Sequence, residues 1–133
     1  MPRRFIQSDG MSWMEAKTAC ESLGMGIALI EINFPEENDA ILTELRRLGG
    51  GPGPWNCTDV WLGLTDRDFE GNFVLESSHQ SSSFTNWYPS EPNDSNGEDC
   101  VILASENGRW KDYACDRRET SSCIISAVCE RFA

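Results

Sequence analysis

The chain has 133 residues, a length typical of one domain, and its 22 acidic residues against 11 lysines and arginines give a formal net charge of −11. This charge argues against nucleic acid or an anionic membrane as a partner, because both are bound through basic patches. No apolar run approaches the roughly 18 residues of a membrane-spanning helix, so no membrane insertion is expected. Residues 1–4 do not form a signal peptide, and we expect a single domain over residues 1–133, expressed without its leader.

The chain contains six cysteines, an even number, and none of them lies in a CxxC pair or in a Cys/His cluster of the kind that holds zinc. This pattern predicts three disulfide bonds, which form and persist in an oxidising compartment. We therefore expect a secreted, extracellular protein. Asn56 begins a glycosylation sequon, and the sequence leaves open whether it carries a glycan.

The first predicted elements are a short opening strand at residues 5–6 and a helix over about residues 13–23. Ser12 and Glu15 have the spacing of a capping box, in which each side chain accepts a hydrogen bond from the backbone of the other residue. Gly24 suits the C-terminal end of this helix, because glycine readily takes a left-handed backbone conformation.

A β-prone apolar run at residues 28–32 precedes a second predicted helix. Pro35 stands at its first position, where a missing backbone N–H costs nothing, and acidic residues follow in its first turn. The Gly/Pro-rich run 49–54 ends this helix. Its inward face is predicted to consist of Ile41, Leu42, Leu45 and Leu48.

The second half of the chain predicts a small antiparallel set of strands, separated by one long polar stretch. That stretch, residues 76–99, has no hydrophobic periodicity. A loop of this length inside a compact domain is usually functional. The predicted strands are residues 60–64, 72–75, 100–103, 109–112 and 124–129.

Carboxylates and carboxamides are concentrated at the end of this polar stretch and just beyond it. Like charges at this density repel one another unless a cation neutralises them, and calcium prefers oxygen ligands of these types. The alternative is an acidic loop that is simply solvated. The residues concerned are Glu91, Asn93, Asp94, Asn96, Glu98, Asp99 and Asp112.

The flanking pattern favours calcium over the solvated loop. The motifs N-W-x-x-x-E-P-N-D, G-E-D-C and W-x-D-x-x-C between residues 86 and 115 together resemble the long loop and calcium-binding core of C-type lectin domains. The run W-L-G-L at 61–64 and the closing C-E at 129–130 match further family motifs, so the resemblance covers about residues 5–132. It implies an α+β, C-type lectin-like fold with two helices, small antiparallel sheets, a long calcium-binding loop and stapling disulfides.

The resemblance also implies how the cysteines pair. One bridge is expected to tie the first helix to the last strand, and a second to cross the base of the long loop. The two remaining cysteines are left for each other, and this third pair departs from the commonest family pattern. The expected pairs are Cys20–Cys129, Cys100–Cys115 and Cys57–Cys123.

In the resembling family, the principal calcium site uses the Glu and Asn of E-P-N, a Glu near the next cysteine, and the Asn and Asp of W-N-D. Here W-N-D has become Trp110-Lys111-Asp112. A lysine has no acceptor atom and cannot ligate calcium. An ammonium group about 4 Å from a divalent ion would cost several kcal/mol, so Lys111 must point away or the ion is weak or absent. The metal ligands implied are Glu91, Asn93, Glu98 and Asp112, and the sugar-contacting positions are Glu91, Asn93, Glu98, Lys111 and Asp112.

The resemblance further implies an auxiliary calcium site, built from acids that follow the W-L-G-L strand and acids of the long loop. The proline of E-P-N is expected to be cis, which would aim its two neighbours at one ion. The auxiliary ligands implied are Asp66, Glu70, Asp94, Glu98 and Asp99.

The resemblance implies calcium-dependent carbohydrate binding, with E-P-N favouring mannose, fucose, glucose or N-acetylglucosamine, and it suggests a role in innate recognition of glycans. The first alternative is a calcium-independent interaction domain of the same fold that binds protein or bacterial wall glycan, since Lys111 replaces the expected ligand. A glycosidase that uses Glu91 and Glu98 as its carboxylate pair is a further alternative, but no catalytic triad or cofactor motif supports an enzyme. Without a heptad or collagen segment, the oligomeric state stays open.

Overall fold

The computed structural model describes residues 3–48, 57–93 and 97–132, which form two helices and seven strands. None of the described helices is long and apolar enough to cross a membrane. The helices are α1 (Trp13–Glu21) and α2 (Pro35–Leu48). The strands are β1 (Arg4–Ile6), β2 (Ile27–Leu29), β3 (Cys57–Thr65), β4 (Val74–Leu75), β5 (Cys100–Leu103), β6 (Trp110–Tyr113) and β7 (Cys123–Arg131).

The strands form one connected sheet in the order β1-β7-β3-β5-β6, with β2 added to β7 and β4 added to β3. Most pairs are antiparallel, but β3 and β7 are parallel, with Cys57 opposite Cys123. The prediction of a purely antiparallel set was therefore wrong at this pair. The reason is physical: the chain between the two strands is long enough to return in either direction, so local pattern does not fix their orientation.

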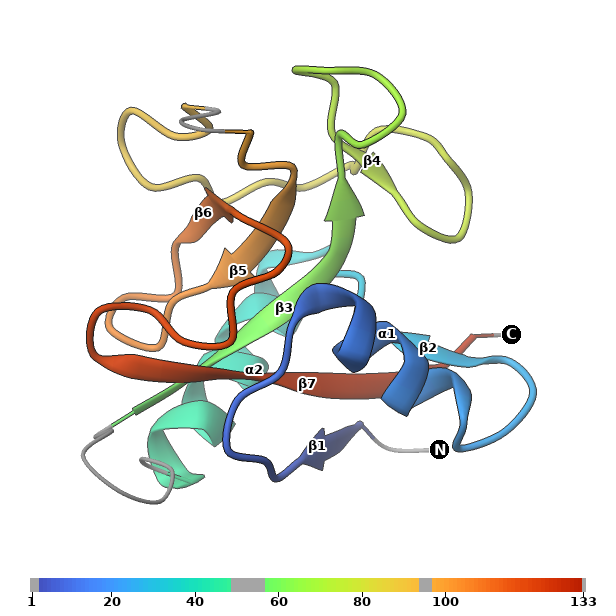
Figure 1. Cartoon of the computed structure of the whole chain (residues 1–133), viewed down its shortest axis with the longest axis vertical. Coiled ribbons are helices and arrows are strands. Elements are labelled where there is room, and N and C mark those ends of the chain that lie inside the picture. Colours follow the sequence, from blue (N-terminus) through green and yellow to red (C-terminus); the bar gives the residue numbers. More distant parts are fainter. Residues whose placement is uncertain (1–2, 49–56, 94–96, 133) are drawn as a thin grey trace.

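Each helix covers one face of the sheet, and together they divide the core into two clusters (Figure 1). Side chains alternate along β3, so Trp61 packs with α1, whereas Val60 and Leu62 pack with Ile41 and other residues of α2. The predicted α+β fold is confirmed, and the loops between β3 and β5 are left together at one end of the molecule, at the top of Figure 1.

The first helix begins as predicted and ends slightly earlier. Ser12 Oγ accepts a hydrogen bond from Glu15 N at 3.2 Å, and Glu15 Oε1 accepts one from Ser12 N at 2.9 Å. At the other end Ser22 is the C-cap, because its N–H bonds to Thr18 O and its hydroxyl donates to Ala19 O. The local polar group at Ser22 therefore stops the helix before Gly24 is reached.

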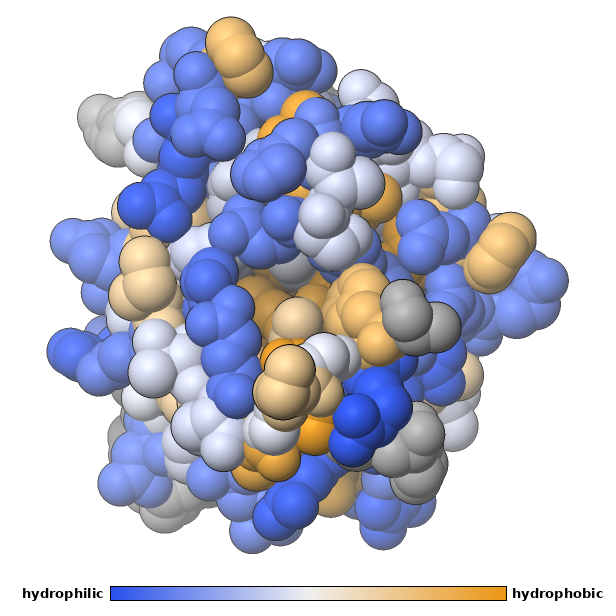
Figure 2. All heavy atoms as spheres, turned by 90° about the vertical axis from the view of Figure 1, so that its right-hand side faces the viewer, coloured by the Kyte–Doolittle hydropathy of each residue, from blue (hydrophilic) through white to orange (hydrophobic). Residues whose placement is uncertain are grey.

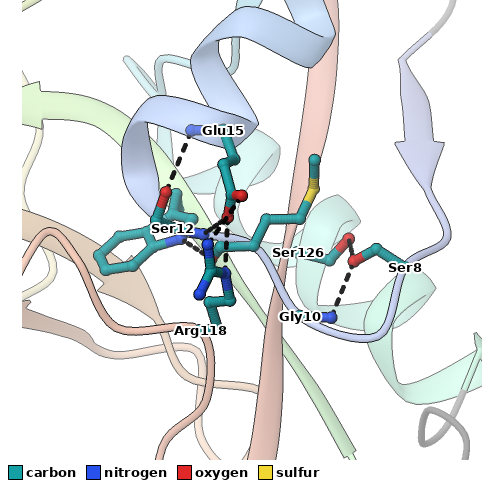
Figure 3. A network of polar contacts seen from close by, with 8 residues as sticks. Ser8, Gly10, Ser12, Glu15, Arg118 and Ser126 are labelled. Carbon is teal, nitrogen blue, oxygen red and sulfur yellow. Dashed lines mark hydrogen bonds and ion pairs between the residues drawn. The ribbon is translucent and has the colours of Figure 1, made fainter.

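A polar network joins the start of α1 to the segment after β6 (Figure 3). Arg118 donates to both carboxylate oxygens of Glu15, at 2.8 and 2.9 Å. These bonds hold the pKa of Glu15 far below its usual 4.5, at about 2. Gly10 lets the chain pass close by, since a Cβ there would lie 2.6 Å from Arg118 O, and its φ of +121° also favours glycine.

Three disulfide bonds staple these layers. Cys20–Cys129 joins α1 to β7, Cys57–Cys123 joins the first residues of β3 and β7, and Cys100–Cys115 closes the hairpin of β5 and β6. These are the three pairs that the sequence motifs imply. The bridges fix the strands from which the candidate site projects.

Candidate functional site

Two groups of acidic and amide side chains meet at the loop end of the molecule. Between β4 and β5 the described residues form turns and one isolated bridge, Trp87 with Trp110, which is consistent with the aperiodic stretch predicted there. On the face shown in Figure 2, most of the surface at this upper end is hydrophilic.

The first group, called here the auxiliary cluster, consists of Asp66, Glu70 and Asp99. One carboxylate oxygen from each lies within 4.8 Å of the others. Asp66 directly follows β3 and Asp99 directly precedes β5, and the backbone N–H of Asp66 donates to Asp99 O at 3.1 Å. Asp66 Oδ2 accepts from Gly71 N at 2.7 Å. The ends of two paired strands and one tight turn thus hold the three carboxylates together.

The electrostatics of the auxiliary cluster fit a bound cation. Asp66 is 1% exposed, and Asp66 Oδ1 and Asp99 Oδ1 are buried oxygens with no hydrogen-bond partner among the described residues. Burial, followed by the adjacent Asp66 carboxylate, raises the pKa of Asp99 above its usual 3.8. A buried acceptor without a donor is costly, and a divalent ion with oxygen ligands would satisfy both atoms.

The second group, called here the principal site, is built around the turn at Glu91, Pro92 and Asn93. The Glu91–Pro92 peptide bond is cis. Asn93 N donates to Asp112 Oδ1 at 3.0 Å, and Asn93 Nδ2 donates to Glu91 Oε2 at 3.2 Å. Asp112 lies on β6 and is only 2% exposed. The turn therefore places the backbone N–H of Asn93 on a carboxylate of the sheet and pairs the Asn93 side chain with Glu91.

Glu91 is surrounded by other acids. Its Oε1 is buried and has no hydrogen-bond partner among the described residues. Burial raises its pKa to about 7, with further contributions from a hydrogen bond to Asp112 and from the charges of Asp112 and Glu98. Two carboxylates and one amide thus lie together, with Glu98 acting on Glu91 through its charge, and donors of these types suit calcium.

Lys111 takes no part in this convergence of acids. Residues on β6 alternate between faces, so Lys111 is half-buried on the side opposite the buried Asp112. Its Nζ lies 4.9 Å from the centroid of the Tyr88 ring. The ammonium group is held by an aromatic face, as in a cation–π contact.

The structure thus places the predicted site residues in two groups, and Glu98 joins the principal site through its charge on Glu91. Asp94, Asn96 and Asn56 lie outside the described residues. Sequence reasoning missed Asn38, which is buried on α2, accepts from Trp110 Nε1 at 2.8 Å and donates to Gly108 O at 2.9 Å. The one sequence feature that could have indicated a role for Asn38 is its position on the apolar face of the second helix, three residues before Ile41.

With this geometry established, comparison with known proteins identifies the family. The family model described as Lectin C-type domain matches residues 9–125. The chain belongs to the C-type lectin domain family. This family is not enzymatic, which confirms the expectation that the chain is not an enzyme.

Several lectin-domain relatives are about one-third identical to this chain. C-type mannose receptor 2 of Homo sapiens is 32% identical over 89% of this chain, and the low affinity immunoglobulin epsilon Fc receptor of Mus musculus is 34% identical over 91%. The chain spans only 7% and 31% of those two proteins. It spans 71% of the alpha-N-acetylgalactosamine-specific lectin of Patiria pectinifera, which is 31% identical over 90% of this chain.

Solved structures of lectin domains superpose on nearly the whole chain. The cow carbohydrate-recognition domain of CD23, crystallised in the presence of a GlcNAc2Man3 oligosaccharide, is 32% identical, with a TM-score of 0.73 and coverage of 98% of this chain and 87% of that one. The mouse scavenger receptor C-type lectin domain gives a TM-score of 0.74 at 24% identity, covering 100% and 91%, which supports the fold alone.

Proposed function

We propose that this lectin domain binds carbohydrate through calcium at the principal site and favours mannose-type sugars. The observation that carries the proposal is the convergence of Glu91, Asn93 and Asp112 across a cis-proline turn, with a buried carboxylate oxygen that no described residue satisfies. Glu98 adds a further carboxylate whose charge acts on Glu91. Lectin homology alone supports carbohydrate binding in general, and calcium is the step that these side chains add.

Calcium bound at these side chains would supply coordination positions for two neighbouring hydroxyl groups of a sugar. The chain's own side chains then determine which sugar fits. Ionised Glu91 can only accept hydrogen bonds, while the Asn93 amide can donate, so the two sides of the turn have opposite polarity. A hydroxyl pair must match that order of acceptor and donor.

The relatives do not fix the type of sugar. One relative carries mannose in its name and another, at similar identity, is named for N-acetylgalactosamine. The mannose-type assignment therefore depends on the E-P-N order itself, which resembles the mannose-binding arrangement of the family, whereas its galactose-binding members carry Q-P-D.

The auxiliary cluster would hold a second calcium ion through Asp66, Glu70 and Asp99, with Glu98 and Asp94 as the remaining proposed ligands. Its position between the ends of β3 and β5 supports a role in fixing the loop end. A shallow polar sugar site displaces ordered water and gains little net free energy, so useful binding would need several sites together. An extracellular setting with millimolar calcium fits both the ion sites and the three disulfides.

One rival remains, a calcium-independent interaction domain of the same fold, and the observation in its favour is Lys111. The lysine removes one of the oxygen ligands that the family pattern expects. Chelation separates the two hypotheses. Binding to mannose-type glycans that persists in chelator would favour the rival.

The decisive experiment compares glycan binding by the wild type and by the double variant Glu91→Gln/Asn93→Asp in millimolar calcium. The double variant reverses the polarity of the turn while it keeps shape and total charge, and each unpaired polar group costs about 1 to 3 kcal/mol, so mannose binding should fall about tenfold or more. The matched control is Glu36→Gln/Asn107→Asp, which makes the same chemical changes at two exposed positions away from the turn. Equal binding by the wild type and the turn variant would contradict the proposal.

A further inference from the structure

The amide of Asn38 is buried between α2 and the start of β6. Asn38 is 3% exposed, so its amide depends on protein partners. Its Oδ1 accepts a hydrogen bond from Trp110 Nε1 at 2.8 Å, and its Nδ2 donates to Gly108 O at 2.9 Å. The bond to Gly108 O fixes which end of the amide faces the indole. Helix α2 therefore holds Trp110, the first residue of β6, by a directed hydrogen bond.

The turn at Gly108 lets α2 come close enough for these bonds. A Cβ on Gly108 would lie 2.9 Å from Leu42 Cδ2 and 3.4 Å from Asn38 Nδ2. The φ of +75° at Gly108 also favours glycine. Asn86 Nδ2 donates to the same carbonyl oxygen, Gly108 O, at 2.7 Å. One carbonyl group thus joins the helix to the long loop between β4 and β5.

From Trp110 the support passes to the loop segment that carries Glu91. Trp110 N donates to Asn86 O, and Tyr88 N donates to Trp110 O, each at 2.8 Å. Glu91 N then donates to Tyr88 O at 2.9 Å. The rings of Trp87 and Trp110 also meet edge to face, with 5.8 Å between their centroids. The position of Trp110 therefore governs where this loop segment lies.

Trp110 is also tied to Asp112, the other carboxylate of the principal site. Trp110 and Asp112 are both buried and stand two positions apart on β6, so their side chains lie on the same face of the strand. Asp112 Oδ1 accepts from Asn93 N at 3.0 Å. Glu91 and Asp112 are thus connected to Trp110 by two separate routes. The separation of the two carboxylates consequently depends on how Trp110 is held.

We propose that Asn38 is a positioning residue for the principal site: by holding the Trp110 indole, it sets the placement of Glu91 relative to Asp112 and hence the calcium affinity. The inference rests on the proposed function, since it concerns the proposed calcium ligands. Asn38 acts through Trp110 and not by contact with the ion. Groups that orient metal ligands from behind typically change metal affinity by about 10- to 100-fold when they are mutated.

The first test is Asn38→Leu, which keeps the approximate size of the side chain and removes both hydrogen bonds. Calcium is titrated calorimetrically into the folded protein, well below its melting temperature. The principal site should bind calcium about tenfold more weakly than in the wild type. The calcium concentration that supports half-maximal binding of a mannose-type glycan should rise by a similar factor. Calcium affinity equal to that of the wild type would overturn the inference.

The matched controls are Ile41→Val and Ile41→Ala, which shorten a buried side chain on the same helix. Ile41 packs in the same core cluster as Trp110, so both variants should lose stability. They should keep the wild-type calcium affinity, because they leave the amide–indole bond intact. If calcium affinity falls with stability in the Ile41 variants as it does in Asn38→Leu, the effect is a general loss of packing and the positioning role is overturned.

Trp110→Phe tests the same hydrogen bond from its other side, and it carries the test where Asn38→Leu is too unstable to purify. It removes the Nε1 donor and keeps an aromatic ring, so calcium affinity should again fall, and an unchanged affinity would contradict the inference. Trp61→Phe is its control, because Trp61 Nε1 donates to Met11 O in the other core cluster. This control should leave calcium affinity unchanged.

The double variant Asn38→Leu/Trp110→Phe tests whether Asn38 acts through Trp110. It should lose no more calcium affinity than Trp110→Phe alone, since the shared bond is already absent. A further loss of about tenfold would overturn the route through Trp110.

The wild type separates this inference from the function beneath it. If the wild type binds calcium and glycan and Asn38→Leu binds both equally well, the positioning role fails and the proposed function stands. If the wild type binds no calcium, both fail.

Discussion

Glu15 and Glu91 carry the same side chain in two regions of the molecule, and their electrostatic surroundings are opposite. At the start of α1, two hydrogen bonds from Arg118 hold the pKa of Glu15 near 2. At the loop end, burial and the nearby Asp112 and Glu98 raise the pKa of Glu91 to about 7. The scaffold pairs its acid with a basic side chain, whereas at the loop end burial and neighbouring acids raise the pKa of Glu91 and of Asp99.

The largest effect is expected for a substitution in the scaffold, Trp61→Ala, which tests whether the stability of the scaffold is independent of calcium. Trp61 is fully buried and its Nε1 donates to Met11 O at 2.7 Å, so Trp61→Ala should cost about 3 to 5 kcal/mol of unfolding free energy. Chemical denaturation should give the same loss in calcium and in chelator. Trp87→Ala is the comparison, because Trp87 is only partly buried beside the loop end and should lose less. If the unfolding free energy lost in Trp61→Ala depends on calcium, the scaffold and the loop end are not energetically independent.

Calcium should stabilise the loop end and, through it, the whole fold. An ion that binds the folded but not the unfolded chain at a hundred times its dissociation constant adds about 2.7 kcal/mol. Extracellular calcium modules bind at roughly 0.1 to 1 mM, so the melting temperature should rise in millimolar calcium and fall in chelator. Magnesium at the same concentration should have a smaller effect, since it prefers a tighter octahedral shell. An unchanged melt would count against both ion sites.

The effect of Asp99→Asn on the stability of the protein should change sign when calcium is added. Without calcium the substitution removes repulsion between Asp99 and Asp66 and should stabilise the protein slightly, by roughly 0.5 kcal/mol, because the site is partly exposed. With calcium it removes a charged ligand and should lower the stabilisation that calcium gives. Asp39→Asn removes one charge from an exposed position on α2 and should show no such reversal. Melting curves of both variants with and without calcium test this, and the same sign in both conditions would contradict a cation at the auxiliary cluster.

The sequence predicted those parts of the fold whose interactions are short in range. The capping box at Ser12 and the start of α2 at Pro35 each depend on residues within one helical turn. The orientation of β3 against β7 was predicted wrongly, because it depends on how a long intervening chain returns. The acids of the candidate site were predicted from motifs, because the spacing of these motifs matches that of a family whose fold is known.

Contacts between distant segments were beyond sequence reasoning. Asn38 and Trp110 are 72 positions apart, and nothing local indicates that the amide of one supports the ring of the other beside Asp112. Sequence reasoning left two alternatives for Lys111: its side chain points away from the ion, or the ion is weak or absent. Where it goes, onto the Tyr88 ring, depends on the backbone bonds that draw residues 86–88 along β6.

The smallest expected effect is a pair of opposite pH trends, measured on metal-free protein. The folded-state pKa of Glu15, about 2, lies below the usual 4.5, so its stabilisation is present above pH 4.5 and is lost as the pH falls through 2. The folded-state pKa of Glu91, about 7, lies above 4.5, so its contribution is present below pH 4.5 and is lost as the pH rises through 7. The melting temperature of Glu15→Gln should therefore approach that of the wild type in acid, while Glu91→Gln should become the more stable protein toward pH 8. Added calcium should abolish the second trend, because the ion favours ionised Glu91. Curves for the two variants that run parallel to each other across the pH range would show that both acids are neutralised alike, and the contrast between the two regions would fail.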